Sequence, residues 1–375
     1  MKTQILILFV GVTLLQNCKP SVPRSSQIGT LSEISYALRN TLQANNTGTG
    51  TTGTGTTGTD GGTGTSTGTE TGTTIAYVLP MKTGQTTSYS LGDDGQYQIG
   101  RARTYTDNLG GTITEDSSGL IWQKCSRGQT NNPSCSGSAT TANWTTAGSY
   151  CTGLILAGKT WRLPTMNELA NLVDYSRSSP PSVNTTFFPA TVANYYWSFS
   201  TYSLDTTNAW LVNFNLSDVI NLVKTDNYYV RCISGTNNTP STIFTDNSNG
   251  TVTDQATGLI WQKCSAGLSG TTCETGSAGI YTWTSALSYC NSLSLASRTW
   301  RLPNVNELRT IIDLTRTSSP SIDTTAFPAT DANSYWSSTT YAPSTTLAWQ
   351  VNFNSGYVVN DFKTIPTYVR CVSGQ

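Results

Sequence analysis

The sequence predicts a disulfide-stapled α+β fold in two tandem copies, each a mainly antiparallel sheet with two helices. Three observations predict it. The same pattern of residues occurs twice within residues 80–375, at an offset of 139 residues. Each copy contains four cysteines. Within each copy, a hairpin pattern is followed by two helical patterns and then by strands, which is the order typical of an α+β domain.

The duplication is visible as repeated sequence motifs. Gly119–Cys125 recurs as Gly258–Cys264, and Trp161–Pro164 recurs as Trp300–Pro303. A period this long indicates duplicated domains and excludes a solenoid of short repeats. All ten Trp lie in the repeats at matching positions, which predicts core packing for them: Trp122, Trp144, Trp161, Trp197, Trp210, Trp261, Trp283, Trp300, Trp336 and Trp349. Since each copy has its own Trp and Cys set, we expect residues 80–236 and 237–375 to fold separately.

The first copy illustrates the predicted elements. Residues 112–114 and 120–122 flank a turn and predict a hairpin. Residues 144–156 carry apolar side chains at helical spacing. Thr165 and Glu168 have the spacing of a capping box, which predicts that a second helix begins there. Runs of aromatic and β-branched residues predict strands at 196–198, 209–214 and 228–232.

The nine cysteines divide into Cys18 and four per repeat. In an exported protein an even number per domain indicates disulfides, and four cysteines allow three pairings. We favour a short local bridge and a long one in each repeat: Cys125–Cys135, Cys151–Cys232, Cys264–Cys273 and Cys290–Cys371. A zinc site is excluded by the spacings and by the absence of His.

The N-terminus has the pattern of an export signal. Residues 1–17 combine a basic start with an apolar run that is too short to span a bilayer. The residues before Cys18 resemble a bacterial lipoprotein box, which implies lipidation of Cys18; the alternative is an ordinary cleaved signal. Residues 18–46 contain one short helical pattern. Residues 47–79 begin with an almost pure Thr/Gly tract, which predicts a disordered tether. We therefore expect a lipid-anchored protein of the bacterial outer membrane that faces the exterior.

Composition excludes several classes of function. Lys plus Arg and Asp plus Glu both number 21, so bulk charge does not favour nucleic acid as a partner. Without His there is no Ser-His-Asp triad and no His-ligated metal site. We predict no catalytic residues, no cofactor and no metal. The pairs Asp107/Asn108 and Asp246/Asn247 could ligate calcium, although a role in turns is favoured.

Several motifs resemble a known family. These motifs are Gly119–Cys125, Trp161–Pro164 and Tyr229–Cys232, with their second copies. They resemble a bacterial family of unknown-function domains that includes the C-terminal domain of the Legionella collagen-like adhesin. Their order is also similar to the C-type-lectin-like and formylglycine-generating-enzyme-like fold, which the resemblance therefore implies for both repeats. The adhesin domain is implicated in binding sulfated polysaccharides and host surfaces.

The predicted function is that of a surface lipoprotein with tandem, adhesin-like binding modules for an extracellular polysaccharide or a host matrix protein. Candidate ligand-binding residues are those that add aromatic rings or cations to polar loops: Arg177, Tyr195, Tyr202, Tyr228 and Arg316. Two alternatives remain open, namely an enzyme of the formylglycine-generating type and a structural envelope lipoprotein without a ligand. The sequence leaves the oligomeric state open.

Overall fold

The computed structural model describes residues 77–236 and 243–374, which belong to one compact unit, Gly72–Gln375. The predicted signal peptide, Cys18, the N-terminal helical pattern and the Thr/Gly tract lie outside the described residues. Within the described part of the chain, no helix is long and apolar enough to cross a membrane.

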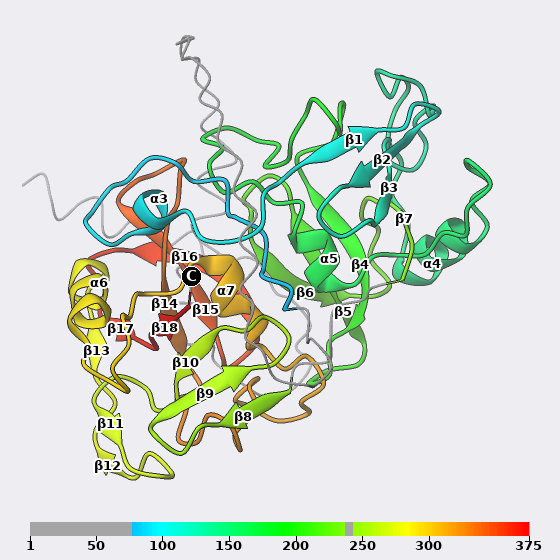
Figure 1. The fold of residues 1–375 in the computed structure, drawn as a ribbon. Helices are drawn as coiled ribbons and strands as arrows, with labels where there is room; N and C mark the ends of the chain where they lie inside the picture. Colours follow the sequence, from blue (N-terminus) through cyan, green and yellow to red (C-terminus); the bar gives the residue numbers. More distant parts are fainter. Residues whose placement is uncertain (1–76, 237–242, 375) are drawn as a thin grey trace, which may run out of the picture. The chain divides into compact units, whose positions relative to one another are not determined.

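The first repeat follows the predicted order of elements (Figure 1). Its hairpin is formed by β2 and β3, and the predicted capping box is present, because Thr165 accepts a hydrogen bond from the Glu168 amide and the Glu168 side chain accepts one from the Thr165 amide. The elements are β1 (Tyr105–Asp107), β2 (Thr112–Glu115), β3 (Ile121–Gln123), α4 (Trp144–Thr152), α5 (Met166–Ala170), β4 (Tyr195–Thr201), β5 (Asn208–Asn213), β6 (Val219–Val223) and β7 (Ile233–Ser234).

The second repeat has the same elements with four additional short strands, β11, β12, β13 and β17. Asn304 and Glu307 make the equivalent capping box at α7. The elements are β8 (Phe244–Asp246), β9 (Thr251–Asp254), β10 (Ile260–Gln262), β11 (Leu268–Ser269), β12 (Thr275–Gly276), β13 (Ile280–Tyr281), α6 (Trp283–Ser292), α7 (Val305–Thr310), β14 (Ser334–Thr340), β15 (Leu347–Asn352), β16 (Tyr357–Phe362), β17 (Thr367–Tyr368) and β18 (Val372–Ser373).

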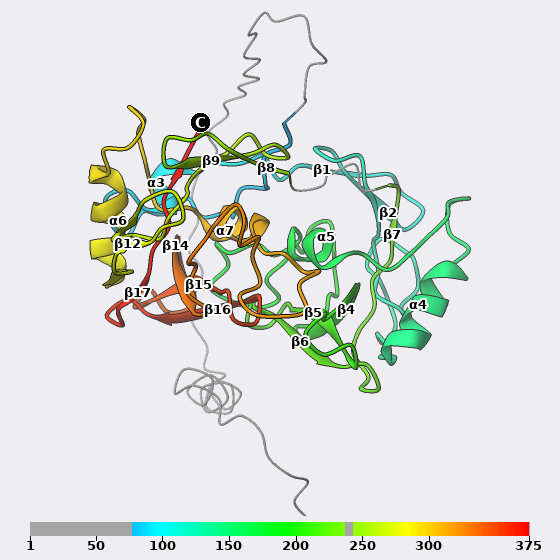
Figure 2. The same cartoon turned by 90° about the horizontal axis from the view of Figure 1, so that it is seen from below.

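The strands form one large sheet and three smaller ones. An eight-stranded sheet has the order β13-β17-β14-β15-β16-β6-β5-β4, and its pairs are antiparallel except β14 with β17. Each repeat adds a four-stranded sheet, β1-β2-β3-β7 and β18-β10-β9-β8, and β11 pairs with β12. Helices α5 and α7 contact the large sheet through β4 and β5 and through β14 and β15, and Figure 2 shows both on the same side of it.

The two repeats meet at equivalent strands. Strand β6 pairs with β16 antiparallel, and Val219 lies opposite Val358, its own counterpart at the offset of 139 residues. Equivalent residues that face each other define a local two-fold axis, as in an isologous dimer. One hydrophobic cluster contains residues of both repeats, including Trp210 and Trp349. In the whole chain the two copies share a sheet and a core, and the separate folding of each copy stays a prediction.

The four disulfides join the pairs that the sequence favoured. Cys125–Cys135 and Cys264–Cys273 close short loops of 10 and 9 residues, whereas Cys151–Cys232 and Cys290–Cys371 each span 81 residues. The long bridges tie α4 and α6 to the segments just before β7 and β18. Each repeat is thus closed from its first long helix to its last strand.

Two features differ from the sequence-based elements. Strand β6 was missed, because the polar residue Asn221 interrupts the apolar run Val219–Val223 at its centre. Residues 228–232 form single bridges in place of a strand, Tyr228 with Ala142 and Tyr229 with Tyr196.

An extended stretch precedes the first repeat and docks on the second. We call residues 78–103 the lead-in segment; it includes the short helix α3 (Asp94–Tyr97), which Asp93 caps by accepting a hydrogen bond from the Gln96 amide. Asn306 donates to the Met81 carbonyl at 2.8 Å, and the Gln85 side chain bonds both the amide and the carbonyl of Thr340 at 3.0 Å. Its contact with the first repeat includes a hydrogen bond from the Tyr175 amide to the Thr83 carbonyl.

Candidate functional site

The aromatic residues predicted to bind a ligand lie in two different environments. Tyr195 and Tyr228 pack edge to face with ring centroids 5.6 Å apart, and Tyr228 also packs on buried Trp197. Tyr202 packs instead on Trp210, within the core that the repeats share. Burial raises the pKa of the Tyr195 hydroxyl. The pair Tyr195/Tyr228 is therefore half-buried at the edge of the core.

The two arginine candidates lie in equivalent loops of the two repeats. Arg316 donates to the Ser318 carbonyl and to the Thr324 hydroxyl, within its own loop. Arg177 is half-buried, and its Nε has no hydrogen-bond partner among the described residues. The described contacts bring only Tyr195 and Tyr228 together, and the other three candidates make their contacts elsewhere.

The arginine of the repeated Arg-Leu-Pro motif forms an ion pair with a glutamate in each repeat. Arg162 binds Glu168 through two hydrogen bonds of 2.8 and 2.7 Å, and Arg301 binds Glu307 through two of 2.6 Å. The environments differ, because the side chain of Arg162 is 34% exposed and that of Arg301 is 8% exposed. Each glutamate also closes the capping box of its helix, so these carboxylates have a structural role.

A second pair of arginines is fully buried without a carboxylate. Arg231 donates to the carbonyls of Gln123 and Lys124 and to the hydroxyls of Ser126 and Thr191. Arg370 makes the equivalent four bonds in the second repeat. Desolvation lowers the pKa of both guanidinium groups. These residues join the segment after the hairpin to the final strand, and they are out of reach of a ligand.

The residues considered for calcium are used in turns. Asp107 forms an ion pair with Lys124 at 2.6 Å and accepts from the Leu109 amide, and Asp246 pairs with Lys263 at 2.7 Å. The hydrogen bond from the lysine holds the pKa of each carboxyl below its ordinary value. Asn108 bonds the hydroxyls of the following strand.

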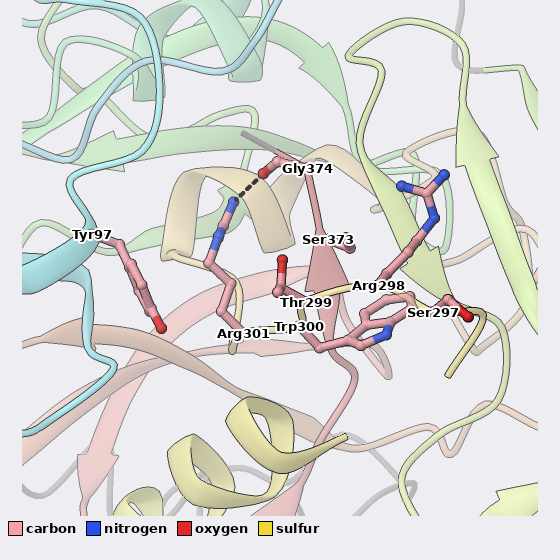
Figure 3. A pocket seen from close by; sticks show the side chains of 8 residues that line it. All are labelled: Tyr97, Ser297, Arg298, Thr299, Trp300, Arg301, Ser373 and Gly374. Atoms are coloured by element: carbon pink, nitrogen blue, oxygen red, sulfur yellow. Dashed lines mark hydrogen bonds between the residues drawn. The ribbon is translucent and has the colours of Figure 1, made fainter. Parts of the chain in front are cut away.

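A pocket of about 460 Å³ lies where the lead-in segment meets the second repeat. Figure 3 shows Tyr97 of the lead-in segment on one side and Arg298 and Trp300 on the other, with Thr299 and Arg301 between them. Ser297, Ser373 and Gly374 complete the lining. The volume is within the range of sites for small molecules or for single sugar units of a longer chain.

The charge of this pocket comes from Arg298. Arg301 is neutralised by Glu307, and its second nitrogen also donates to the Gly374 carbonyl at 3.2 Å, the dashed line in Figure 3. The indole N–H of Trp300 is bound to the Leu295 carbonyl. Arg298, by contrast, is exposed, with the hydroxyls of Ser297 and Thr299 beside it in the sequence. The lining is therefore cationic and rich in hydroxyl groups.

Comparison with known protein families shows to which family the chain belongs. The profile of the Lcl C-terminal domain matches residues 111–234 and again residues 250–373. The chain belongs to the Lcl C-terminal domain family. The two matches coincide with the two repeats, which confirms the tandem arrangement inferred from the sequence and agrees with the resemblance noted there. A comparison with curated protein sequences finds no match.

The sequence missed the polar pocket and one exposed aromatic cluster of these Lcl C-terminal domains. Trp144 is half-buried, unlike the other nine Trp, and stacks on Phe199 with ring centroids 6.0 Å apart. Lys224 lies 4.3 Å above the Trp144 ring. A signal was available, because the repeats differ at this point: Phe199 stands where the second copy has Ser338.

Proposed function

We propose that this protein is an adhesin-like surface lipoprotein that binds an anionic extracellular polysaccharide. The observation that supports it most is the family match over both repeats, since the family includes the C-terminal domain of an adhesin. Four disulfides fit an exported protein. Lipidation of Cys18, anchoring in the outer membrane and the outward orientation are part of this proposal.

The pocket around Arg298 is the proposed contact for the sulfate or carboxylate groups of the polysaccharide. An exposed guanidinium gives charge-assisted hydrogen bonds to such groups, and neighbouring hydroxyls suit the hydroxyls of a sugar. The chain has equal numbers of acidic and basic residues, so the attraction is local and we expect salt to weaken it. A host matrix protein is the second candidate ligand.

Binding of the full chain to immobilised heparin and to an uncharged dextran tests this function. We expect binding to heparin alone, a several-fold loss in Arg298→Ala, and a further loss as salt rises. The matched control is Lys159→Ala, the equivalent position of the first repeat, which lies outside the pocket. Equal binding to both polymers, or no effect of Arg298→Ala, would contradict the proposal.

The enzyme alternative is disfavoured by the cysteines. A formylglycine-generating enzyme needs free thiols, and all eight cysteines of the described residues are paired in disulfides. A structural lipoprotein without a ligand would bind neither polymer in the same experiment.

A further inference from the structure

The lead-in segment covers one face of the second repeat through a defined set of contacts. Asn306 donates to its Met81 carbonyl, and Thr340 exchanges two hydrogen bonds with the Gln85 carboxamide. The Thr339 hydroxyl donates to Asp94 at 2.7 Å. The Lys363 ammonium lies 5.3 Å from the ring centroid of Tyr89, in the lead-in segment, and 3.8 Å from that of Trp283. The face therefore contacts the backbone of a polypeptide segment together with its carboxamide, carboxyl and aromatic side chains.

The first repeat retains almost all of the residues that make these contacts. At the offset of 139 residues, Asn167 corresponds to Asn306, Ser200 to Thr339 and Thr201 to Thr340. Lys224 and Trp144 correspond to Lys363 and Trp283. Lys224 donates a hydrogen bond of 2.9 Å to the Thr201 hydroxyl, and Lys363 donates the equivalent bond of 2.7 Å to the Thr340 hydroxyl. The described residues contain one lead-in segment, and it is docked on the second repeat.

These residues are uncovered in the first repeat. Asn167 is exposed whereas Asn306 is completely buried, and Phe199 is 60% exposed. Ser200 and Thr201 are half-buried, whereas Thr339 and Thr340 are completely buried. Val78 and Arg101, near the two ends of the lead-in segment, line a small pocket together with Asn167. We call this surface the open face; its residues are Trp144, Arg162, Asn167, Phe199, Ser200, Thr201 and Lys224.

We propose that the open face docks an extended segment of a partner protein that carries a carboxamide and an acidic side chain. The occupant of the equivalent face is a polypeptide, and the paired donor and acceptor at Thr340 are matched by a carboxamide such as that of Gln85. The Ser200 hydroxyl, the counterpart of the Thr339 hydroxyl that donates to Asp94, favours an acidic side chain at the position that Asp94 takes in the second repeat. An apolar group of the partner covers Phe199.

Phe199 distinguishes the partner from the lead-in segment. Its counterpart Ser338 is almost fully covered, so a ring at this position requires a smaller side chain opposite it. The wild-type open face should therefore bind the lead-in sequence weakly. Phe199→Ser restores the residue of the second repeat and should bind the lead-in sequence more tightly.

The test uses the full chain and a fluorescent synthetic peptide of residues 78–101. We expect weak binding to the wild type and tighter binding to Phe199→Ser. Adding Asn167→Ala to that variant should weaken binding roughly threefold to tenfold, the usual effect of losing one hydrogen bond. The same loss is expected when the peptide carries Gln85→Ala. Circular dichroism of each variant checks that the fold is retained.

Three outcomes would overturn the proposal. The first is a peptide that fails to bind Phe199→Ser at millimolar concentration. The second is binding that responds to Asn306→Ala and not to Asn167→Ala, because the peptide would then be exchanging with the lead-in segment of the second repeat. The third is heparin binding that is weakened by Asn167→Ala, which would make the open face a polysaccharide site.

Discussion

Replacing Asp94 by Asn should remove much of the pH dependence of stability. Asp94 begins helix α3 of the lead-in segment, is buried, and accepts hydrogen bonds from the hydroxyls of Thr83 and Thr339 at 2.7 Å. The pKa of this carboxyl is raised from 3.8 to about 7, chiefly by burial and to a smaller extent by nearby Glu307, against the lowering effect of the two hydroxyls and Arg301. The folded protein therefore holds a proton here that the unfolded chain has already lost at pH 5 to 6.

The sign and magnitude follow from linkage. A raised pKa contributes stability that is complete below the unfolded value near 4 and is lost as pH rises to about 7. A difference of about three pH units at about 1.4 kcal/mol each gives a loss on the order of 4 kcal/mol across this window. Asn is neutral at every pH and can still accept from both hydroxyls. Asp94→Asn should thus resemble the wild type at pH 4.5 and be more stable at pH 8.

Urea denaturation followed by Trp fluorescence at pH 4.5 to 8 measures this effect. The reasoning is refuted if the free energies of unfolding of wild type and Asp94→Asn run parallel over that range. Asp218 provides a second arm, because burial also raises its pKa to about 7 and neither of its carboxyl oxygens has a hydrogen-bond partner among the described residues. Asp218→Asn should flatten the profile in the same direction, and the double variant should flatten it further.

Three other predictions concern the framework. Replacing Cys151 and Cys232 by Ser should lower the free energy of unfolding by about 4–5 kcal/mol, and losing a short bridge should lower it by about 3 kcal/mol, because the long bridge closes an 81-residue loop; equal losses in urea denaturation would argue against the chain-entropy account. Cutting the chain at a protease site inserted within residues 237–242 should leave the halves together in size-exclusion chromatography, since they share a sheet and a core; separate elution would show independent modules. Arg370→Met should lower stability by roughly 3 kcal/mol or more by stranding four hydrogen-bond acceptors; an unchanged melting temperature would contradict this.

Local patterns predicted the local structure well. The spacing of Thr165 and Glu168 was enough to place the start of α5, because a capping box depends on residues only three apart. The duplication assigned four cysteines to each repeat and left three pairings open, and the favoured one, with a short and a long bridge in each repeat, is the one observed. The hairpin of β2 and β3 likewise needed only a turn between two apolar runs.

Contacts between distant parts of the chain carried no such signal. The Gln85 side chain and the Thr340 backbone lie 255 residues apart, and nothing in either stretch shows that they meet. The edge pairing of β6 with β16 was invisible for the same reason, because a strand sequence does not say which edge it will join. The sequence also does not separate exposed from packed aromatic rings in a polar stretch, and Tyr202 packs against the shared core whereas Tyr195 and Tyr228 pack on each other.

The duplication gives two domains with similar sequences, but equivalent residues of the two domains differ in their exposure to solvent. A single lead-in segment covers the second repeat, where Trp283 and Ser338 are buried, and leaves Trp144 and Phe199 accessible in the first. A phenyl ring that is 60% exposed contributes little to folding, because most of its apolar area stays in water. Its presence at the position where the covered copy has serine is best explained by a contact made with another molecule. The asymmetry therefore separates the two proposed roles, with charge recognition at the pocket of the second repeat and segment docking on the open face of the first.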